Sequence, residues 1–280
     1  MQQASAQEAA AEHGTQVMGN GWIAGAMAAV VAWGSVALAG PEGQGLLSIT
    51  FDDASRSQHE LGLPATRDHG LAGTLFVITK YAEEAADDPD GWYMGWPQIR
   101  DFRDSGWEIG AHSHTHPHLT ELADDEVIAE LDTAKAIIKK RTGITPVSFA
   151  PPFGNFDAGT ARLILERYRH LLLAWGGNKG RNPLHGVDVG QIGRFEVSHR
   201  HSPKQVCEVI DDAARNGIWL VLMFHEFVER DPAEYQYGIE DFRHILACAK
   251  LLQDRKTIRV VSVADAVKLL GAEQLSDPTE

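Results

Sequence analysis

The stretch that decides the fold is LLSITFDD, residues 46–53, in which an uncharged run of six residues ends in two consecutive carboxylates. Five of the six are apolar or β-branched, which is typical of a strand buried on both faces of a parallel sheet. Successive side chains of a strand point to opposite faces, so Asp52 and Asp53 can share one cavity only if the strand ends there and the backbone turns. The pair therefore predicts a site at the carboxyl end of a strand, with an ordinary polar turn or a helix cap as the alternative.

Strand-like and helix-like stretches alternate along the rest of the chain. Further strands are expected over 72–79, 107–111, 147–150, 170–174, up to 197, over 218–224 and over 258–263. A helix is expected over 57–70, where Gly62 and Pro64 interrupt it. Further helices are expected over 96–105, 124–142, 159–167, 204–216, 239–252 and 264–270. Segments 81–95 and 176–188 have the composition of loops. This alternation implies parallel strands joined by helices, and seven or eight such units favour a single-domain α/β barrel.

Composition narrows the possible partners. The 280 residues are 44% hydrophobic, enough for one large core, and carry a net charge of −14. That charge argues against nucleic acid or an anionic membrane surface as a partner and suits a neutral or cationic one. Two cysteines, Cys207 and Cys248, are too few for a disulfide framework or a cysteine-based zinc site. We expect two buried thiols rather than a bridge.

The ends of the chain lie outside the expected barrel, which covers residues 41–272. Residues 22–39 are uncharged, and the sequence VALA at 36–39 resembles a signal-peptidase site. The run is also long enough for a membrane anchor, although the opening has no Lys or Arg and contains Glu8 and Glu12. We expect residues 1–40 to be an export or anchoring leader, with a loosely packed leader as the alternative, and 273–280 to be a tail. The protein would then be secreted, periplasmic or associated with the cell envelope, and otherwise cytoplasmic.

A histidine-rich segment, HSHTHPH at 112–118, directly follows a predicted buried strand. His112 and His116 have the i, i+4 spacing that puts two imidazoles on one side of a turn, as two ligands of one metal require. His114 and His118 have the same spacing, but the strand end holds only His112 in place, so we favour the first pair. Asp53 or Asp52 can supply a third ligand.

A set of two histidines and a carboxylate leaves coordination positions for water and substrate, as in hydrolytic zinc sites. The same set holds ferrous iron in oxygenases. The second carboxylate favours hydrolysis, because a water nucleophile needs a base and oxygen activation does not. Like the acidic pair, four other positions lie at the carboxyl ends of predicted strands, and so at one face of the expected barrel. They are His112, Pro151-Pro152-Phe153, Trp175, and His225 after the apolar run 218–224. This is the face on which α/β barrels build active sites.

The order TFDD at 50–53, His112-Ser113-x-x-His116, PPFG at 151–154 and a late His225 resembles the polysaccharide deacetylase family, also called the NodB homology domain. The resemblance covers about residues 45–265. It implies a distorted (β/α) barrel of seven or eight units. It also implies a carbohydrate-esterase-type hydrolase that removes N-acetyl groups from an amino-sugar polysaccharide or oligosaccharide. Such substrates include chitin-like, peptidoglycan and exopolysaccharide chains.

The resemblance also implies roles for individual residues. Asp53, His112 and His116 look like ligands of a divalent metal, with Zn²⁺ as the first candidate. Asp52 looks like the base for the metal-bound water that attacks the acetamide, and His225 like the acid that protonates the leaving amine. The resemblance further assigns an oxyanion contact to the backbone N–H of Phe153. Substrate or oxyanion contacts are also expected of Pro152, Trp175 and Arg194.

One departure concerns the third motif, which in the family begins with an arginine that orients the base. Here that position is Ala150, and Arg194 is the candidate replacement, with a surface ion pair to Glu196 as an equal alternative. The missing arginine keeps open a non-catalytic glycan-binding barrel. A non-haem iron oxygenase and a small-molecule C–N hydrolase on the same fold also stay open.

Overall fold

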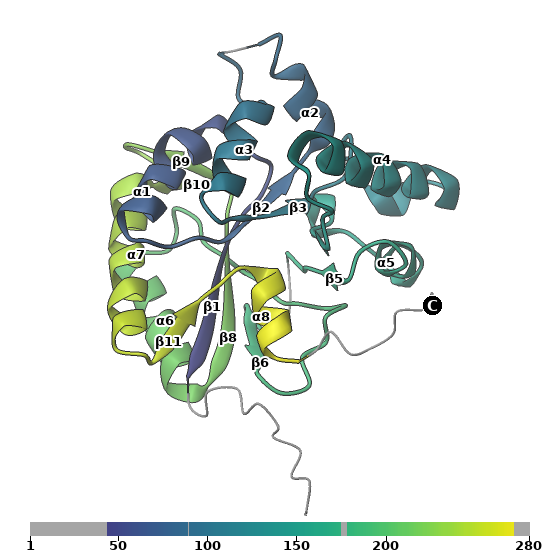
Figure 1. The fold of residues 1–280 in the computed structure, drawn as a ribbon. Helices are drawn as coiled ribbons and strands as arrows, with labels where there is room; N and C mark the ends of the chain where they lie inside the picture. The colour runs from purple at the N-terminus through teal and green to yellow at the C-terminus, as the bar shows by residue number, and fades with distance from the viewer. Residues whose placement is uncertain (1–43, 89, 175–177, 272–280) are drawn as a thin grey trace, which may run out of the picture. The chain divides into compact units, whose positions relative to one another are not determined.

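The computed structural model describes residues 44–271 apart from 89 and 175–177. Six parallel strands form its centre. The first of them in the sequence, β1 (Gly45–Phe51), lies at the expected place and is buried along its whole length. The strands lie in the order β5 (His170–Leu171), β4 (Ser148–Phe149), β3 (Glu108–Ala111), β2 (Thr74–Val77), β1, β8 (Ile218–Phe224). Figure 1 shows β1 and β8 side by side along their length.

The segment around residues 192–196 closes these strands into a ring. Leu172, just after β5, forms a parallel bridge with Ile192, and β7 (Phe195–Glu196) pairs in parallel with β8. The barrel is distorted because two further strands share partners with the ring. β11 (Ile258–Val260) pairs with the first residues of β1, while β6 (Arg181–Pro183) runs antiparallel to the start of β8. The prediction of a distorted (β/α) barrel is confirmed.

Helices surround the barrel between the strands (Figure 1). Helix α1 packs against α7, α7 against α6, α3 against α4, and α4 against α5. Their bounds are α1 Leu63–Asp68, α2 Thr79–Glu84, α3 Trp96–Asp104, α4 Asp124–Thr142, α5 Ala158–Leu165, α6 Pro203–Asn216, α7 Ile239–Asp254 and α8 Val263–Leu269. Short elements complete the described chain: a π-helical turn at Gln58–Gly62, 3₁₀ turns at Leu119–Glu121 and Pro152–Gly154, and the paired strands β9 (Glu226–Val228) and β10 (Gln236–Gly238).

Three local predictions differ from the structure. Gly62 and Pro64 do not end the helical backbone, which changes type there: a π-helical turn ends at Gly62 and α1 begins at Leu63, with the proline in its first turn. Gly62 lets the chain approach the rings of Phe227 and Phe51. The expected loop 81–95 begins inside helix α2. The expected loop 176–188 contains β6, whose partner in β8 is distant in sequence.

The prediction of two buried thiols is wrong. Cys207 on α6 and Cys248 on α7 form a disulfide, with their Cα atoms 5.9 Å apart, and both residues are only half-buried. Each helix pattern could be recognised alone, but the contact between α6 and α7 that brings the sulfurs together is a tertiary feature. The expected leader 1–40, the tail 273–280 and Trp175 lie outside the described residues. Within the described part of the chain, no helix combines the length and hydrophobicity needed to cross a bilayer.

An aromatic cluster supports the end of β1, directly beneath the acidic pair. The ring of Phe51 is fully buried and lies 4.6 Å from Trp107, 5.1 Å from Phe227 and 5.9 Å from Phe242, measured between ring centroids. Burying a phenylalanine side chain contributes about 1.5–3 kcal/mol. The residue before Asp52 is therefore held firmly, which fixes where the strand ends.

Candidate metal centre and active site

The backbone turns sharply at the acidic pair. The N–H of Asp52 still donates to the carbonyl of Phe224 in β8, at 3.0 Å, but Asp53 and Ala54 have φ values of +72° and +58°. This left-handed backbone lets two consecutive side chains line the same cleft, and it costs of order 1–3 kcal/mol per residue outside glycine. The turn that the sequence required is present at the predicted residue.

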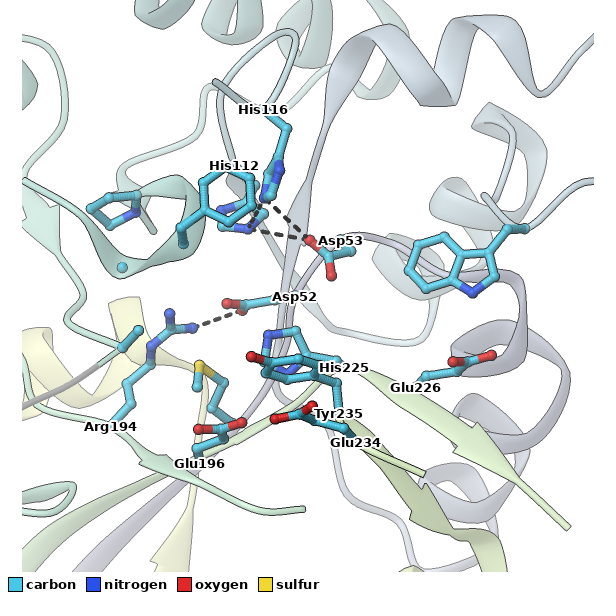
Figure 2. A pocket seen from close by; sticks show the side chains of 16 residues that line it. Asp52, Asp53, His112, His116, Arg194, Glu196, His225, Glu226, Glu234 and Tyr235 are labelled. Carbon is cyan, nitrogen blue, oxygen red and sulfur yellow. Dashed lines mark hydrogen bonds and ion pairs between the residues drawn. The ribbon is translucent and has the colours of Figure 1, made fainter. Parts of the chain in front are cut away.

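Asp53, His112 and His116 form a compact set of metal-ligand atoms (Figure 2). Oδ1 of Asp53 lies 3.3 Å from Nε2 of His112 and 3.6 Å from Nε2 of His116, and the two Nε2 atoms are 3.3 Å apart. Tetrahedral ligands about 2.0–2.1 Å from Zn²⁺ lie about 3.4 Å from one another. The three atoms therefore have the spacing that one small divalent cation requires.

The surroundings orient both imidazoles. Nδ1 of His112 lies 2.7 Å from the carbonyl oxygen of Ala150 and must donate to it, which leaves Nε2 with its lone pair for a metal. His116 has a φ of +62°, and its backbone N–H donates to Oγ of Ser113 at 2.9 Å. The ring of Phe153 covers His116, with centroids 4.5 Å apart. Ala150 thus contributes its backbone at the position where the family has an arginine side chain.

The protonation states suit metal binding. Burial raises the pKa of Asp53, but its hydrogen bond to His112 and the nearby imidazoles outweigh burial and lower that pKa to about 2. Burial, followed by the charge of His112, lowers the pKa of His116 to about 4. For His112 burial lowers the pKa, while Asp53 and Asp52 together raise it above its ordinary value. At neutral pH the set therefore offers one carboxylate and at least one neutral imidazole.

Arg194 holds the other carboxylate. Its Nη1 donates to Oδ1 of Asp52 at 2.7 Å, with the two side chains 0% and 3% exposed, and its Nε donates to the carbonyl of Leu173 at 3.1 Å. Burial raises the pKa of Asp52, but the charge of Arg194, helped by the neighbouring imidazoles, brings it below its ordinary value. Oδ2 of Asp52 forms no hydrogen bond with any of the described residues, so this oxygen remains available to a substrate or water. Of the two partners considered for Arg194, the structure places Asp52 against it.

The cleft that these residues line has a volume of about 490 Å³. His225 lies in it, and Figure 2 shows its ring below Asp52 and beside Tyr235. The carbonyl of His225 accepts a hydrogen bond from Oγ of Ser55 at 3.2 Å and one from Nε2 of Gln58. Nδ1 of His225 is buried with no hydrogen-bond partner among the described residues. Among the described residues, no carboxylate forms an ion pair with His225.

The residues of the third motif differ in burial and in whether they line the cleft. Phe153 has a φ of +56°, is 49% exposed and lines the cleft, with its ring stacked on His118 at 4.0 Å. Pro152 is buried beneath the turn, and Pro151 lines the cleft in its place. Trp175 lies outside the described residues, and the neighbouring Ala174 lines the cleft.

Sequence reasoning missed one wall of the cleft. Glu226 begins β9, and Glu234 and Tyr235 lie between β9 and β10. These two short strands have no hydrophobic pattern from which they could be predicted. Tyr235 has a φ of +63° and is 48% exposed, with its ring 5.5 Å from that of His225. The only local signal was position, because the segment directly follows the strand that ends at His225.

A model of the family described as "Polysaccharide deacetylase" matches residues 39–168, which include the acidic pair, His112, His116 and the third motif. Residues 39–168 of this chain are similar to the polysaccharide deacetylase family.

Curated relatives show the same similarity. Chitin deacetylase 1 of Cryptococcus neoformans is 43% identical over 109 residues, 39% of this chain and 21% of that relative. The peptidoglycan-N-acetylglucosamine deacetylase of Bacillus cereus is 25% identical over 141 residues, 50% of this chain and 47% of that relative. The chain thus spans less than half the length of these two relatives.

The deacetylase fold extends beyond the segment matched by sequence. The Xyl-CE4 domain of a multidomain xylanase from the hindgut metagenome of Trinervitermes trinervoides superposes with a TM-score of 0.57 at 18% identity. The superposition covers 81% of this chain and 92% of that domain. A CE4 family pseudoenzyme from Bacillus anthracis superposes with a TM-score of 0.53 at 15% identity, so the fold alone does not decide whether a member is catalytic.

Proposed function

We propose that this protein is a metal-dependent hydrolase that removes N-acetyl groups from an amino-sugar polysaccharide or oligosaccharide. The observation that carries the proposal is that one cleft contains two carboxylates, each in a different environment. Asp53 lies against two imidazoles, and Asp52 lies against a buried arginine, with one oxygen that forms no hydrogen bond to the described residues. The names of the relatives, chitin deacetylase and peptidoglycan-N-acetylglucosamine deacetylase, support an N-acetylated glycan as the substrate class.

The donor set fits a divalent cation, and two imidazoles with a carboxylate suit Zn²⁺. When bound, such a cation polarises the acetamide carbonyl and lowers the pKa of a water molecule. Asp52, kept ionised and oriented by Arg194, accepts the proton of the attacking water through Oδ2. His225, on the opposite side of Asp52 from the metal ligands in Figure 2, donates a proton to the leaving nitrogen. The oxyanion contact expected of Phe153 stays a prediction.

Acetate release from N-acetylglucosamine oligomers, measured with and without a chelator, tests the proposal. We expect release that stops with the chelator and returns with Zn²⁺. The variant Asp52→Asn should retain the metal and lose turnover, whereas His112→Ala should lose both. Wild-type turnover in Asp52→Asn would overturn the role of Asp52 as the base.

The same assay separates the competing functions. A non-catalytic glycan-binding barrel would bind oligomers without releasing acetate. An iron oxygenase would require Fe²⁺ and oxygen, and a small-molecule C–N hydrolase would release acetate or ammonia from monomers and not from chains. The intact ligand set and the arginine against Asp52 favour the deacetylase over the non-catalytic barrel, because a decayed site has no need to keep a buried ion pair.

We also propose that the protein works in an oxidising compartment, in agreement with the export or anchoring segment expected in residues 1–40. The disulfide between Cys207 and Cys248 supports this, since cytosolic proteins rarely keep structural disulfides. Alkylation of free thiols in protein recovered from its native compartment, followed by mass spectrometry, should find both cysteines protected. Two alkylated cysteines would contradict the proposal.

A further inference from the structure

Trp92 is an exposed aromatic residue in a cleft whose chemistry does not use it. It is 42% exposed and lines the cleft together with Asp53 and the two histidine ligands. It also borders a second, smaller hollow of about 180 Å³. The other residues of that hollow are Tyr81, Glu84, Ala85, Asp88, Gly91 and Tyr93. Trp92 therefore adjoins both the reaction centre and a neighbouring polar depression.

The position of Trp92 is tied to the metal-binding turn. The backbone N–H of Arg56 donates to the carbonyl of Trp92 at 2.7 Å, and the N–H of Met94 donates to the carbonyl of Ala54 at 2.9 Å. Nε of Arg56 also donates to the carbonyl of Gly91 at 2.7 Å. The chain on both sides of Trp92 is thus bonded to the residues that directly follow Asp53. The distance between the tryptophan and the metal ligands is set by backbone hydrogen bonds rather than by a free loop.

One tyrosine contacts the indole from the side, and a second tyrosine stacks on the first. The ring of Tyr93 meets that of Trp92 edge to face, with centroids 4.6 Å apart and planes at 81°. Tyr93 in turn stacks on Tyr81 of α2, at 4.4 Å and 19°. A side chain held in this way loses little conformational entropy when a ligand binds to it. Trp96, four residues later, is only 6% exposed and belongs to the core, so the two tryptophans of this segment have different uses.

We propose that Trp92 is a stacking platform for a sugar ring next to the one that reacts, and that the hollow beside it accepts the ring that follows. A pyranose ring has an apolar face of C–H groups and a periphery of hydroxyls. The indole offers an apolar surface to that face, and the carboxylates of Glu84 and Asp88 offer acceptors to hydroxyls. This inference rests on the proposed function, which it deepens by predicting that the substrate is a chain of several sugars.

Substrate length provides the kinetic test. We compare kcat/KM for the N-acetylglucosamine pentamer with that for a small aryl acetate, in the metal-loaded enzyme. Trp92→Ala should lose about tenfold more on the pentamer than on the aryl acetate, mainly through KM, because only the chain reaches the platform. Trp92→Phe, which keeps an aromatic face, should recover most of the loss. Leu251→Ala, which removes a 50% exposed side chain of α7 outside the cleft, should change neither value.

Two results would overturn the proposal. One is a pentamer rate that Trp92→Ala leaves unchanged. The other is an equal loss on both substrates, which would mean that Trp92 only supports the turn that carries Asp53.

A binding measurement separates this inference from the proposed activity. Cellopentaose is a neutral β-linked chain with the same ring and no acetamide, so the metal-loaded enzyme can be titrated with it calorimetrically without turnover. We expect Trp92→Ala to bind it about tenfold more weakly than the wild type. Equal binding by the two proteins, or no binding by either, would overturn the platform. Absence of acetate release from every glycan would overturn the proposed function and leave this comparison to decide the platform.

Discussion

Replacing Arg194 with methionine removes the guanidinium from Asp52 and keeps most of the apolar side chain. The two charged groups are 2.7 Å apart and almost fully buried, so Asp52 would be left in a site that disfavours its charge. Removing one partner of a buried ion pair costs about 3–5 kcal/mol when the other stays charged. Asp52 can avoid part of that cost by taking up a proton.

The direction of the pKa change follows from the opposing causes. Burial raises the pKa of Asp52, and Arg194 is the largest influence that lowers it. An adjacent arginine lowers the pKa of an aspartate by about 1–3 units, equivalent to about 1.4–4 kcal/mol. In Arg194→Met the pKa of Asp52 should therefore rise by about that amount. The ionised base would be lost at a higher pH than in the wild type.

The assay is the dependence of kcat/KM on pH for an N-acetylated oligomer, with metal content measured at each pH. We expect the acid limb of the Arg194→Met profile to move to higher pH by about 1–3 units, with the metal retained at neutral pH. Arg215→Met serves as the matched control, because Arg215 is a 68% exposed arginine paired with Asp211 on the surface of α6. A folded, metal-loaded Arg194→Met enzyme with an unshifted acid limb would refute the role of Arg194.

Three further predictions concern the metal and the scaffold. Because the pKa of His112 is raised and the metal binds only its neutral form, Zn²⁺ affinity should fall as the pH is lowered, and should begin to fall at a higher pH than for an ordinary histidine, which competition titrations across a pH series would show. Replacing Cys207 and Cys248 with serine opens a loop with a sequence separation of 41, and should lower the free energy of unfolding in urea by about 4 kcal/mol; no change would mean that the bridge does not form. Phe51→Ala should cost about 3–5 kcal/mol in the same assay and weaken metal binding, because Phe51 anchors the strand that ends in the acidic pair.

The sequence indicated the parts of the fold that have a strong local pattern. Helix 124–142 was predicted with the bounds that α4 has, because its apolar residues repeat at helical spacing and Gly143 takes the left-handed backbone that ends it. β1 was recognisable because a strand buried on both faces has no polar alternation to obscure it. Features that depend on distant partners were missed. The Cys207–Cys248 bridge needs the contact between α6 and α7, and β6 needs the far end of β8.

Most of the candidate site could be predicted from the sequence because of the order and direction of the strands. Strands of a parallel barrel end at one face, so acids after β1 and histidines after β3 had to lie near one another. Arg194 could be proposed only as one of two arrangements, because its partner is 142 positions away in the chain. Tyr235 could not be predicted, since it lies on a short segment whose place in the cleft is decided by tertiary packing.

Anomalous diffraction at the zinc edge, from crystals of the full chain grown with Zn²⁺, tests the central claim most directly. We predict one strong peak about 2.0–2.2 Å from Oδ1 of Asp53 and from Nε2 of both His112 and His116, with Asp52 still bonded to Arg194 and outside the coordination sphere. A zinc ion bound elsewhere, or bound by Asp52 in place of Asp53, would contradict the account.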